Sequence, residues 1–198
     1  MFRALAFLGF LVAGNFLAAE TAEQLNQQLA QIHDRTSAAG KFAQLAKYVI
    51  DNESKALESN NSLTQQFEEM RQNQGESSLI VFRAIATKEE AAAARAYYLG
   101  VRDNLLAAQI VVAFEIMALQ ASSDAVDNST RASLSGNLAA TFDSVKEMLK
   151  ESTLKIPDVQ KLSIDSQENA IAARTYYAGV KDNLIARAEA MGRGESFG

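Results

Sequence analysis

The chain has 198 residues, of which 48% are hydrophobic, enough for one compact domain with its own core. Cysteine is absent, which excludes disulfides, thiolate nucleophiles and cysteine-based metal sites. The net charge of −5 comes without a basic stripe, so nucleic acid is not an expected partner, because phosphate contacts supply most of that affinity.

Residues 1–19 have the pattern of a secretory signal peptide. Arg3 gives a short positive region, and residues 4–13 form an apolar run too short to span a membrane comfortably. Cleavage after Ala19 would leave 18 Lys and Arg against 24 Asp and Glu, a net charge of −6. We therefore expect an exported protein, either periplasmic or secreted to the outside of the cell. The alternative is an uncleaved N-terminal anchor.

A stripe of apolar residues at helical spacing begins after Glu23. It consists of Leu25, Leu29, Ile32, Ala39, Ala43, Ala46, Ile50 and Leu57. This spacing predicts a first helix that continues through Gly40. Residues 58–62 form a break, after which a capping box at Ser62 and Gln65 starts a shorter helical segment. A loop at 72–78 and an apolar connector at 79–86 follow.

A second capping box, formed by Thr87 and Glu90, predicts the start of a long helix that runs to about residue 121. Its second half is apolar on almost every side, so we expect it to be the central and most buried helix. The stretch 105–121 is only seventeen residues long and contains Gln109 and Glu115. We therefore expect no stable transmembrane helix in the mature chain.

Residues 122–130 separate this helix from a third amphipathic helix. The apolar residues of that helix are Leu134, Leu138, Phe142, Val145 and Leu149. A turn around Pro157 precedes a last helix, capped either by Asp165 with Glu168 or by Ser166 one residue on. This helix is expected to end near residue 191, and the Gly-rich residues 193–198 are expected to form a flexible tail.

A duplicated motif is the strongest signal in the sequence. "RAYYLGVRDNL" at 95–105 is followed by "RTYYAGVKDNL" at 174–184, and residues 91–107 match 170–186 at twelve of seventeen positions. The duplication predicts two similar helical units of about 78 residues, 24–102 and 103–187. We expect them to form an all-α antiparallel bundle of about four main helices, a single domain over residues 20–192.

The repeated motif allows two interpretations. In the first it is a packing device: Gly100 and Gly179 admit a neighbouring helix or ring, and Arg102 and Lys181 lie over the tyrosine rings one turn earlier. In the second it is a binding site where the two copies meet, with apolar walls and a few polar groups. The candidate ligand- or partner-binding residues are Arg95, Tyr97, Tyr98, Asp103, Asn104, Arg174, Tyr176, Tyr177, Asp182 and Asn183.

The remaining candidates for chemistry are few. His33 is the only histidine and has no Glu-x-x-His neighbour, so we expect no metal site and no cofactor. Glu115 lies in an apolar stretch. A buried carboxylate there would have a raised pKa and be a site candidate; the alternatives are that it faces a cation across the bundle or lies at the rim. Without cysteine or a second histidine, the commonest nucleophiles and general bases are missing, and we do not expect an enzyme.

The sequence therefore favours an exported, non-catalytic helical-bundle protein that acts through protein–protein contacts, as a periplasmic or extracellular structural or accessory subunit. Its partner would be another protein or a second copy of itself. Two alternatives remain open. One is a carrier of a small apolar or anionic ligand held between the two units. The other is a membrane-active helical protein whose central helix inserts into lipid.

Overall fold

The computed structural model describes residues 20–52, 69, 72, 85, 87–149 and 159–193. In these residues the chain forms four helices and no strand, which confirms the predicted all-α bundle. The helices are α1 (Ala22–Asp51), α4 (Lys88–Ala121), α5 (Asn128–Leu149) and α6 (Gln167–Arg193). The predicted signal peptide, the end of the predicted first helix after residue 52, most of the shorter helical segment and of the connector that follow it, the turn around Pro157 and most of the tail lie outside the described residues.

The helix starts are set by local sequence. The predicted capping box of α4 is present, with the Thr87 side chain accepting from the Glu90 amide. At α6 the second of the two predicted caps forms, because Ser166 Oγ accepts from the Asn169 amide. A further capping box, Thr21 with Gln24, starts α1 at Ala22, one residue before Glu23, after which the predicted apolar stripe begins.

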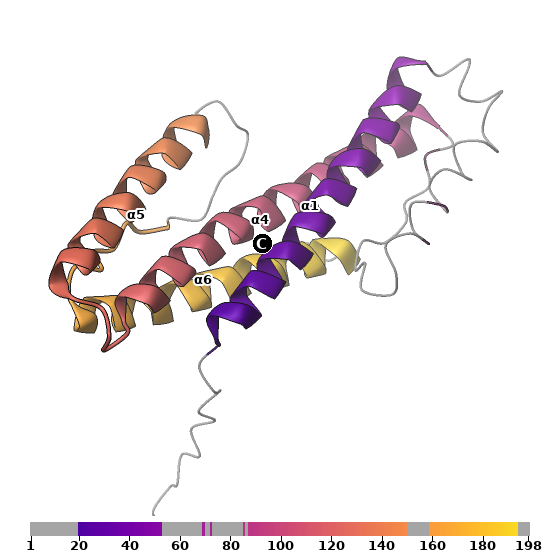
Figure 1. The fold of residues 1–198 in the computed structure, drawn as a ribbon. Helices are drawn as coiled ribbons and strands as arrows, with labels where there is room; N and C mark the ends of the chain where they lie inside the picture. The colour runs from indigo at the N-terminus through magenta and orange to yellow at the C-terminus, as the bar shows by residue number, and fades with distance from the viewer. Residues whose placement is uncertain are drawn as a thin grey trace, which may run out of the picture.

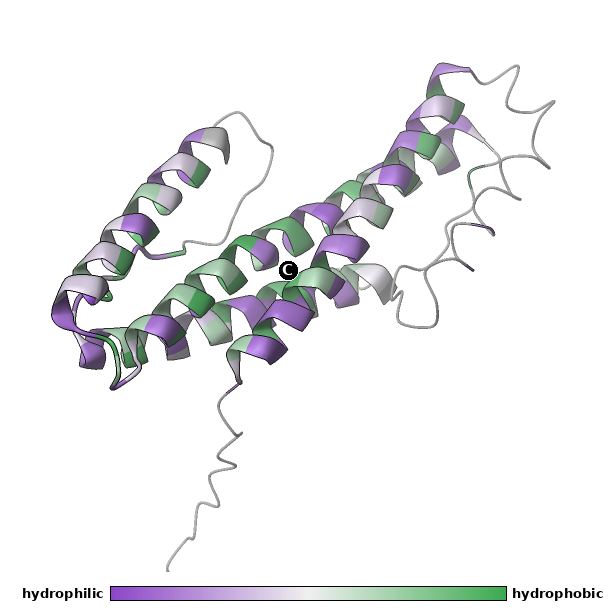
Figure 2. Ribbon diagram, viewed as in Figure 1, coloured by the Kyte–Doolittle hydropathy of each residue, from purple (hydrophilic) through white to green (hydrophobic). Residues whose placement is uncertain are grey.

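Helix α4 lies at the centre of the molecule, with α1 along one side and α6 along another (Figure 1). Both neighbours run antiparallel to it: Phe42 of α1 meets Tyr98, while Tyr177 of α6 meets Phe114 near the other end of α4. α4 is also the most uniformly hydrophobic of the helices (Figure 2). The prediction that the 87–121 helix is central is therefore confirmed.

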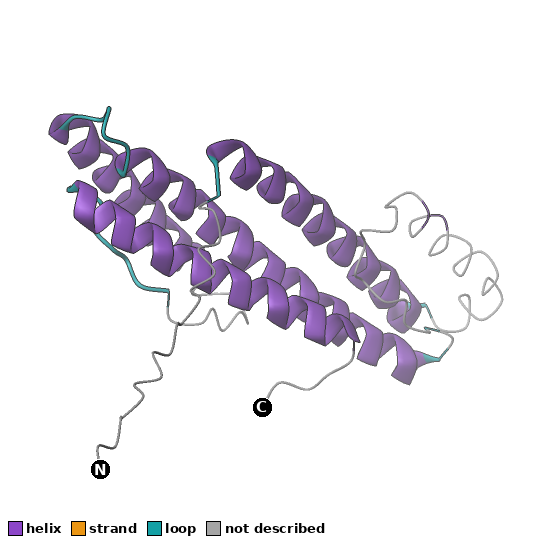
Figure 3. Cartoon of the chain, turned by 90° about the horizontal axis from the view of Figure 1, so that it is seen from below, coloured by secondary structure: helices purple, strands orange, loops and turns teal. Residues whose placement is uncertain are grey.

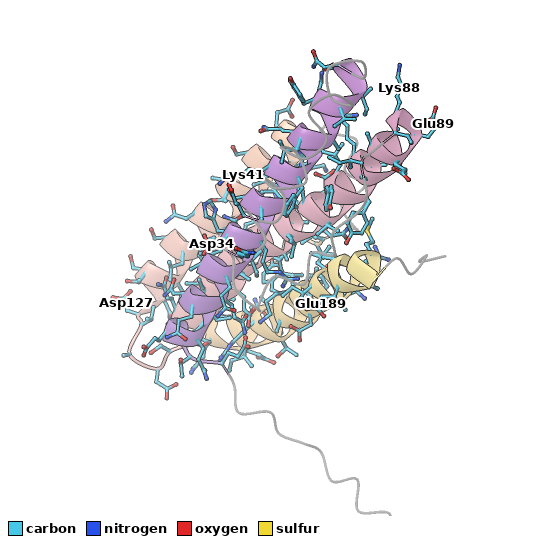
Figure 4. The ribbon with its side chains drawn as sticks, turned by 90° about the vertical axis from the view of Figure 1, so that its right-hand side faces the viewer. Asp34, Lys41, Lys88, Glu89, Asp127 and Glu189 are labelled. Atoms are coloured by element: carbon cyan, nitrogen blue, oxygen red, sulfur yellow. The ribbon has the colours of Figure 1, made fainter. Side chains whose placement is uncertain are left out.

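Helix α5 leaves this three-helix core and contacts mainly the end of α4 (Figure 1). The turn between them is fixed by the buried side chain of Arg131. Its Nε donates to the Ala121 carbonyl at 2.9 Å, and its Nη2 donates to the Ser123 carbonyl at 2.9 Å. A cation at this position satisfies carbonyls left open at the C-terminus of α4. Asp127, beside the turn, and Lys88, at the start of α4, lie at opposite ends of the molecule (Figure 4).

By length and composition, α4 is long and apolar enough to cross a membrane, and it is the one described helix with this property. Half of its most apolar window is buried inside the bundle. A central helix of a soluble bundle has the same composition, so this property does not distinguish the two environments.

Candidate functional site

Both copies of the motif bury their second tyrosine completely. Tyr98 and Tyr177 are each 0% exposed, at equivalent positions on α4 and α6. Tyr98 stacks on Phe42 with ring centroids 5.1 Å apart, and Tyr177 packs on Phe114 at 5.5 Å. In each copy the ring therefore packs on a phenylalanine of a neighbouring helix, α1 for Tyr98 and α4 for Tyr177, which agrees with the packing interpretation.

The tyrosine hydroxyls of the second copy hold down the segment before α6. Tyr176 Oη accepts from the Gln160 amide at 2.9 Å, and Tyr177 Oη accepts from the Leu162 amide at 3.1 Å. Tyr177 also donates to the Gln160 carbonyl at 3.2 Å. This segment has no regular secondary structure of its own, so these bonds satisfy backbone groups that no helix or strand can pair.

In the first copy, the face that carries Gly100 receives the C-terminal turn of α6. A Cβ added at Gly100 would overlap Met191 Cε, so the end of the Met191 side chain lies where any larger residue would place its first carbon. Asn104 Nδ2 donates to the Gly100 carbonyl at 2.9 Å and lies 3.4 Å from Met191 Sδ. Tyr97 Oη donates to the Gly192 carbonyl at 2.8 Å. The prediction that Gly100 admits a neighbouring helix is confirmed.

The same prediction is wrong for Gly179. Its surroundings are open: a Cβ added there meets nothing within 4 Å, and the residue is exposed. Asp182 and Asn183, which follow it on the same side of α6, are exposed as well. The physical reason is position in the bundle, because α6 has α4 on one side while α4 lies between two helices.

The motif cations also differ between the copies in the groups that they bind. Arg95 is exposed, and Arg102 donates from Nε and Nη2 to its neighbour Asp103, at 2.8 Å and 2.6 Å. In the second copy, Arg174 donates to the Glu20 carbonyl and Lys181 binds the Glu20 carboxylate. Arg102 and Lys181 therefore each form an ion pair with a carboxylate, within the motif for Arg102 and outside it for Lys181.

Lys181 forms the centre of a buried polar cluster, the Lys181 cluster, made with Glu20, Gln28 and Glu115. Its side chain is 2% exposed and lies between α1, α4 and α6. Lys181 Nζ lies 2.6 Å from Glu20 Oε2, 3.1 Å from Gln28 Oε1 and 3.2 Å from Glu115 Oε2. An ammonium ion in this position donates hydrogen bonds to Glu20 and Gln28 and is paired with the charge of Glu115, which compensates for its burial.

Glu115 is the carboxylate of this cluster that is buried most deeply, with 2% of its side chain exposed. Its Oε2 faces Lys181 but accepts no hydrogen bond of favourable geometry. Burial raises the pKa of Glu115, and the attraction of Lys181 offsets this only in part. The prediction that Glu115 is either buried with a raised pKa or paired with a cation across the bundle is confirmed in both of its forms.

Lys181 and Glu20 shift each other's pKa. Burial acts to lower the pKa of Lys181, but its hydrogen bond to Glu20 and the charge of Glu115 outweigh burial and raise it. Burial acts to raise the pKa of Glu20, but hydrogen bonds from Lys181 and Gln28 outweigh it and lower it. Lys181 is therefore held as a cation, which is the wrong state for a nucleophile or a general base.

The structure does not bring the two copies of the motif together into one pocket. Tyr177 packs at Phe114, sixteen residues along α4 from Tyr98, which corresponds to a separation of about 24 Å at 1.5 Å per residue. Arg95 lies on α4 at the end where Tyr98 lies, and Arg174 lies on α6 beside Glu20. The candidate residues thus form two separate groups.

Sequence reasoning overlooked Glu20, Gln28 and the role of Lys181. Glu20 lies directly after the predicted cleavage site, and Gln28 is a polar residue in a helix of many polar residues. One signal in the sequence was the difference between the copies at this position, where the first has Arg102 and the second has Lys181. In the structure this difference coincides with a difference in burial, since Lys181 is buried and Arg102 is partly exposed. His33 is exposed and lies 3.3 Å from Gln109 through its Nδ1, an ordinary surface contact.

No family model matches this chain, and neither the curated proteins nor the solved structures contain a match to it. The function is therefore argued from the chain's own residues.

Proposed function

We propose that this protein is an exported, non-catalytic helical-bundle protein that acts through protein–protein contacts, as a structural or accessory subunit in the periplasm or outside the cell. The observation that carries the proposal is the difference between the two motif copies. Gly179, Asp182 and Asn183 lie on an exposed face, while their counterparts on α4 are partly covered.

The buried charges favour a structural role over catalysis. The Lys181 cluster closes on itself, since the lysine is paired with Glu20 and Glu115 inside the bundle. A group that is poised for chemistry needs access to a substrate and a pKa near the working pH. Lys181 is buried and its pKa is raised, so it supports the packing of α1, α4 and α6.

The proposal of export is supported by the sequence of residues 1–19 and by the contacts of the residue that follows them. Glu20 is bound through its carbonyl by Arg174 and through its carboxylate by Lys181. Cleavage after Ala19 would make this anchored residue the first of the mature chain. The intact mass of protein recovered from its own source tests this: a chain that begins at Glu20 supports processing, and a chain that retains residues 1–19 contradicts it.

Native mass spectrometry of the same material tests the function. A stable complex with copies of itself or with another protein supports the proposed role in protein–protein contacts. A monomer that carries a small molecule in a defined ratio would overturn it in favour of the ligand carrier. A bare monomer that makes vesicles of anionic lipid leak would overturn it in favour of a membrane-active protein.

A further inference from the structure

Glu20 precedes α1 and has no regular secondary structure, yet side chains from two helices hold it. Its carboxylate accepts from Lys181 Nζ at 2.6 Å and from the side-chain amide of Gln28. Its carbonyl accepts from Arg174. The described chain is helical apart from short connecting stretches (Figure 3), and such stretches are where proteolysis normally begins. Glu20 is thus tied down at a point where a chain is usually open to proteases.

The peptide bond between Glu20 and Thr21 has both of its polar groups occupied. Arg174 donates to the carbonyl, and the amide donates to Gln24 Oε1 at 2.8 Å. A protease binds its substrate as an extended chain and stabilises the charge that develops on the oxygen of the carbonyl under attack. An enzyme that cuts this bond therefore has to displace Arg174 and Gln24 first.

The contacts of Glu20 leave no slack in the chain. Thr21 is the N-cap of α1, its side chain accepts from the Gln24 amide at 3.2 Å, and the helix begins at the next residue. Moving Glu20 into an active site therefore unwinds the first turn of α1. It also removes a hydrogen-bonded oxygen from Lys181, and a buried ammonium that loses a partner is costly. Both α1 and α6 thus oppose the opening of this end of the chain.

We propose that Arg174 and Lys181 shield Glu20, as the N-terminal residue of the processed chain, from proteases. Cleavage of residues 1–19 then takes place before the bundle closes on Glu20. This inference rests on the proposed function, since it takes residues 1–19 to be an export signal. The enzyme that removes them has to accept Glu20 as the residue after the bond that it cuts. Because α6 holds Glu20 in the folded chain, the enzyme meets the chain unfolded, and folding then protects the new N-terminus.

The first copy of the motif provides a matched control for this role. Arg95 and Arg102 stand at the positions equivalent to Arg174 and Lys181. Arg95 is exposed, and Arg102 pairs with the aspartate beside it. Replacing a cation of the first copy therefore changes the charge of the chain by the same amount without releasing Glu20.

Aminopeptidase digestion of the processed chain, residues 20–198, tests the shielding. The probe is an aminopeptidase that removes acidic residues, and intact mass follows the loss of Glu20. Arg174→Met should speed this loss at least about tenfold, because a protease acts on the fraction of molecules in which the bond is open. Arg95→Met should leave the rate unchanged, and circular dichroism checks that both variants are folded.

Gln24→Leu is a second variant for the same measurement. It frees the amide of the Glu20–Thr21 bond from an exposed position on α1, so the bundle keeps its core. The loss of Glu20 should become severalfold faster, because one of the two bonds that hold this peptide group is gone. An unchanged rate in a folded Gln24→Leu chain would contradict the shielding.

The full chain, residues 1–198 in detergent, tests the order of events. A leader peptidase should cut it after Ala19 while it is unfolded, immediately after dilution from urea. Once the bundle has folded, the same enzyme should cut at least about tenfold more slowly, because Glu20 is then held by α6. Arg174→Met should remove much of that protection.

Three further results would overturn the inference: a parent chain that loses Glu20 as fast as Arg174→Met, an equal acceleration by Arg95→Met, or a folded full chain cut as fast as an unfolded one. The proposed function fails on different data. A full chain that the leader peptidase does not cut even when unfolded contradicts the export signal, whatever the aminopeptidase shows. Rapid cutting of the unfolded chain together with slow loss of Glu20 from the folded parent supports both.

Discussion

The copies of the motif on α4 and on α6 share most of their residues but use them differently. Tyr98 and Tyr177 have the same role, since each is fully buried against a phenylalanine of a neighbouring helix. The glycines do opposite things, because Gly100 is in contact with Met191 and Gly179 faces open space. The same residue type at the same helical position therefore has a contact in one copy and none in the other.

The difference follows from the place of each helix in the bundle. α4 packs against α1 and α6 on different sides, so more of its circumference is covered than that of α6. The cations show the opposite pattern, because the one on the less covered helix has the more distant partners. Arg102 pairs with the adjacent Asp103, while Lys181 of α6 contacts Gln28 of α1 and Glu115 of α4. Residue identity limits which contacts are possible, and the neighbouring helices decide which of them form.

The largest predicted effect concerns the cation at equivalent positions of the two copies, Lys181 on α6 and Arg102 on α4. Lys181→Met should reduce the free energy of unfolding by about 3 kcal/mol, because it leaves the buried Glu115 carboxylate without the cation that pairs with it. The equivalent change Arg102→Met should cost less, about 1 kcal/mol, since the Arg102 side chain is 39% exposed and its ion pair with Asp103 is only partly shielded from water. Urea denaturation of both variants measures the two values.

A double variant identifies the cause of this loss. Adding Glu115→Leu to Lys181→Met removes the orphaned carboxylate and should restore most of the lost stability. Equal losses for Lys181→Met and Arg102→Met would show that the Lys181 cluster contributes nothing beyond a surface ion pair.

The glycines should give effects of opposite sign. Gly100→Leu should destabilise the fold by about 1–3 kcal/mol, because it forces Met191 and the end of α6 away from α4. Gly179→Leu should stabilise it by up to about 1 kcal/mol, because leucine is the better helix former and has room. Thermal unfolding at low protein concentration compares them, and a loss at Gly179 would contradict its open surroundings.

The tyrosine hydroxyls should show a local effect of about 1 kcal/mol. Tyr177→Phe removes the acceptor of the Leu162 amide, so that amide should exchange faster with deuterium while the buried ring stays in place. Tyr176→Phe is the matched control, because it releases the Gln160 amide. If both variants changed both amides equally, the segment would open as a unit and the separate assignments would be wrong.

The smallest predicted effect concerns pH. The pKa of Glu20 is lowered in the folded chain, so its pairing stabilises the fold above the unfolded-state pKa of this carboxyl. That contribution is lost as the pH falls through the folded pKa. Glu20→Gln should therefore lower stability at neutral pH, by less than about 1 kcal/mol because a third of the side chain is exposed. The difference from the parent chain should vanish in acid.

Glu115 should give the opposite pH dependence of stability in the same experiment. Its pKa is raised on folding, so its contribution to stability is present below the unfolded-state pKa and is lost as the pH rises through the folded pKa. Glu115→Gln should therefore flatten the stability profile between these two values. Denaturation of the two variants across the acid range separates the groups, and identical profiles would contradict their opposite shifts.

Much of the fold could be predicted from the sequence. The cap at Thr87, the alternative cap at Ser166 and the central place of the apolar helix all follow from patterns within a few residues. The packing role of Gly100 follows as well, since mid-helix glycine is unfavourable without a close neighbour. The site was less predictable, because Glu20 and Lys181 are separated by more than 150 residues and neither belongs to a recognisable spacing.

The sequence by itself determined the helices and the duplicated motif, because helix caps and amphipathic periods are local properties of the chain. Only the tertiary structure decided which motif copy would be covered. Gly100 and Gly179 have the same local sequence, and a helical period marks a face without saying what will pack on it. The physical reason is that burial depends on the neighbouring helices, and α4 lies between two of them while α6 keeps one side exposed.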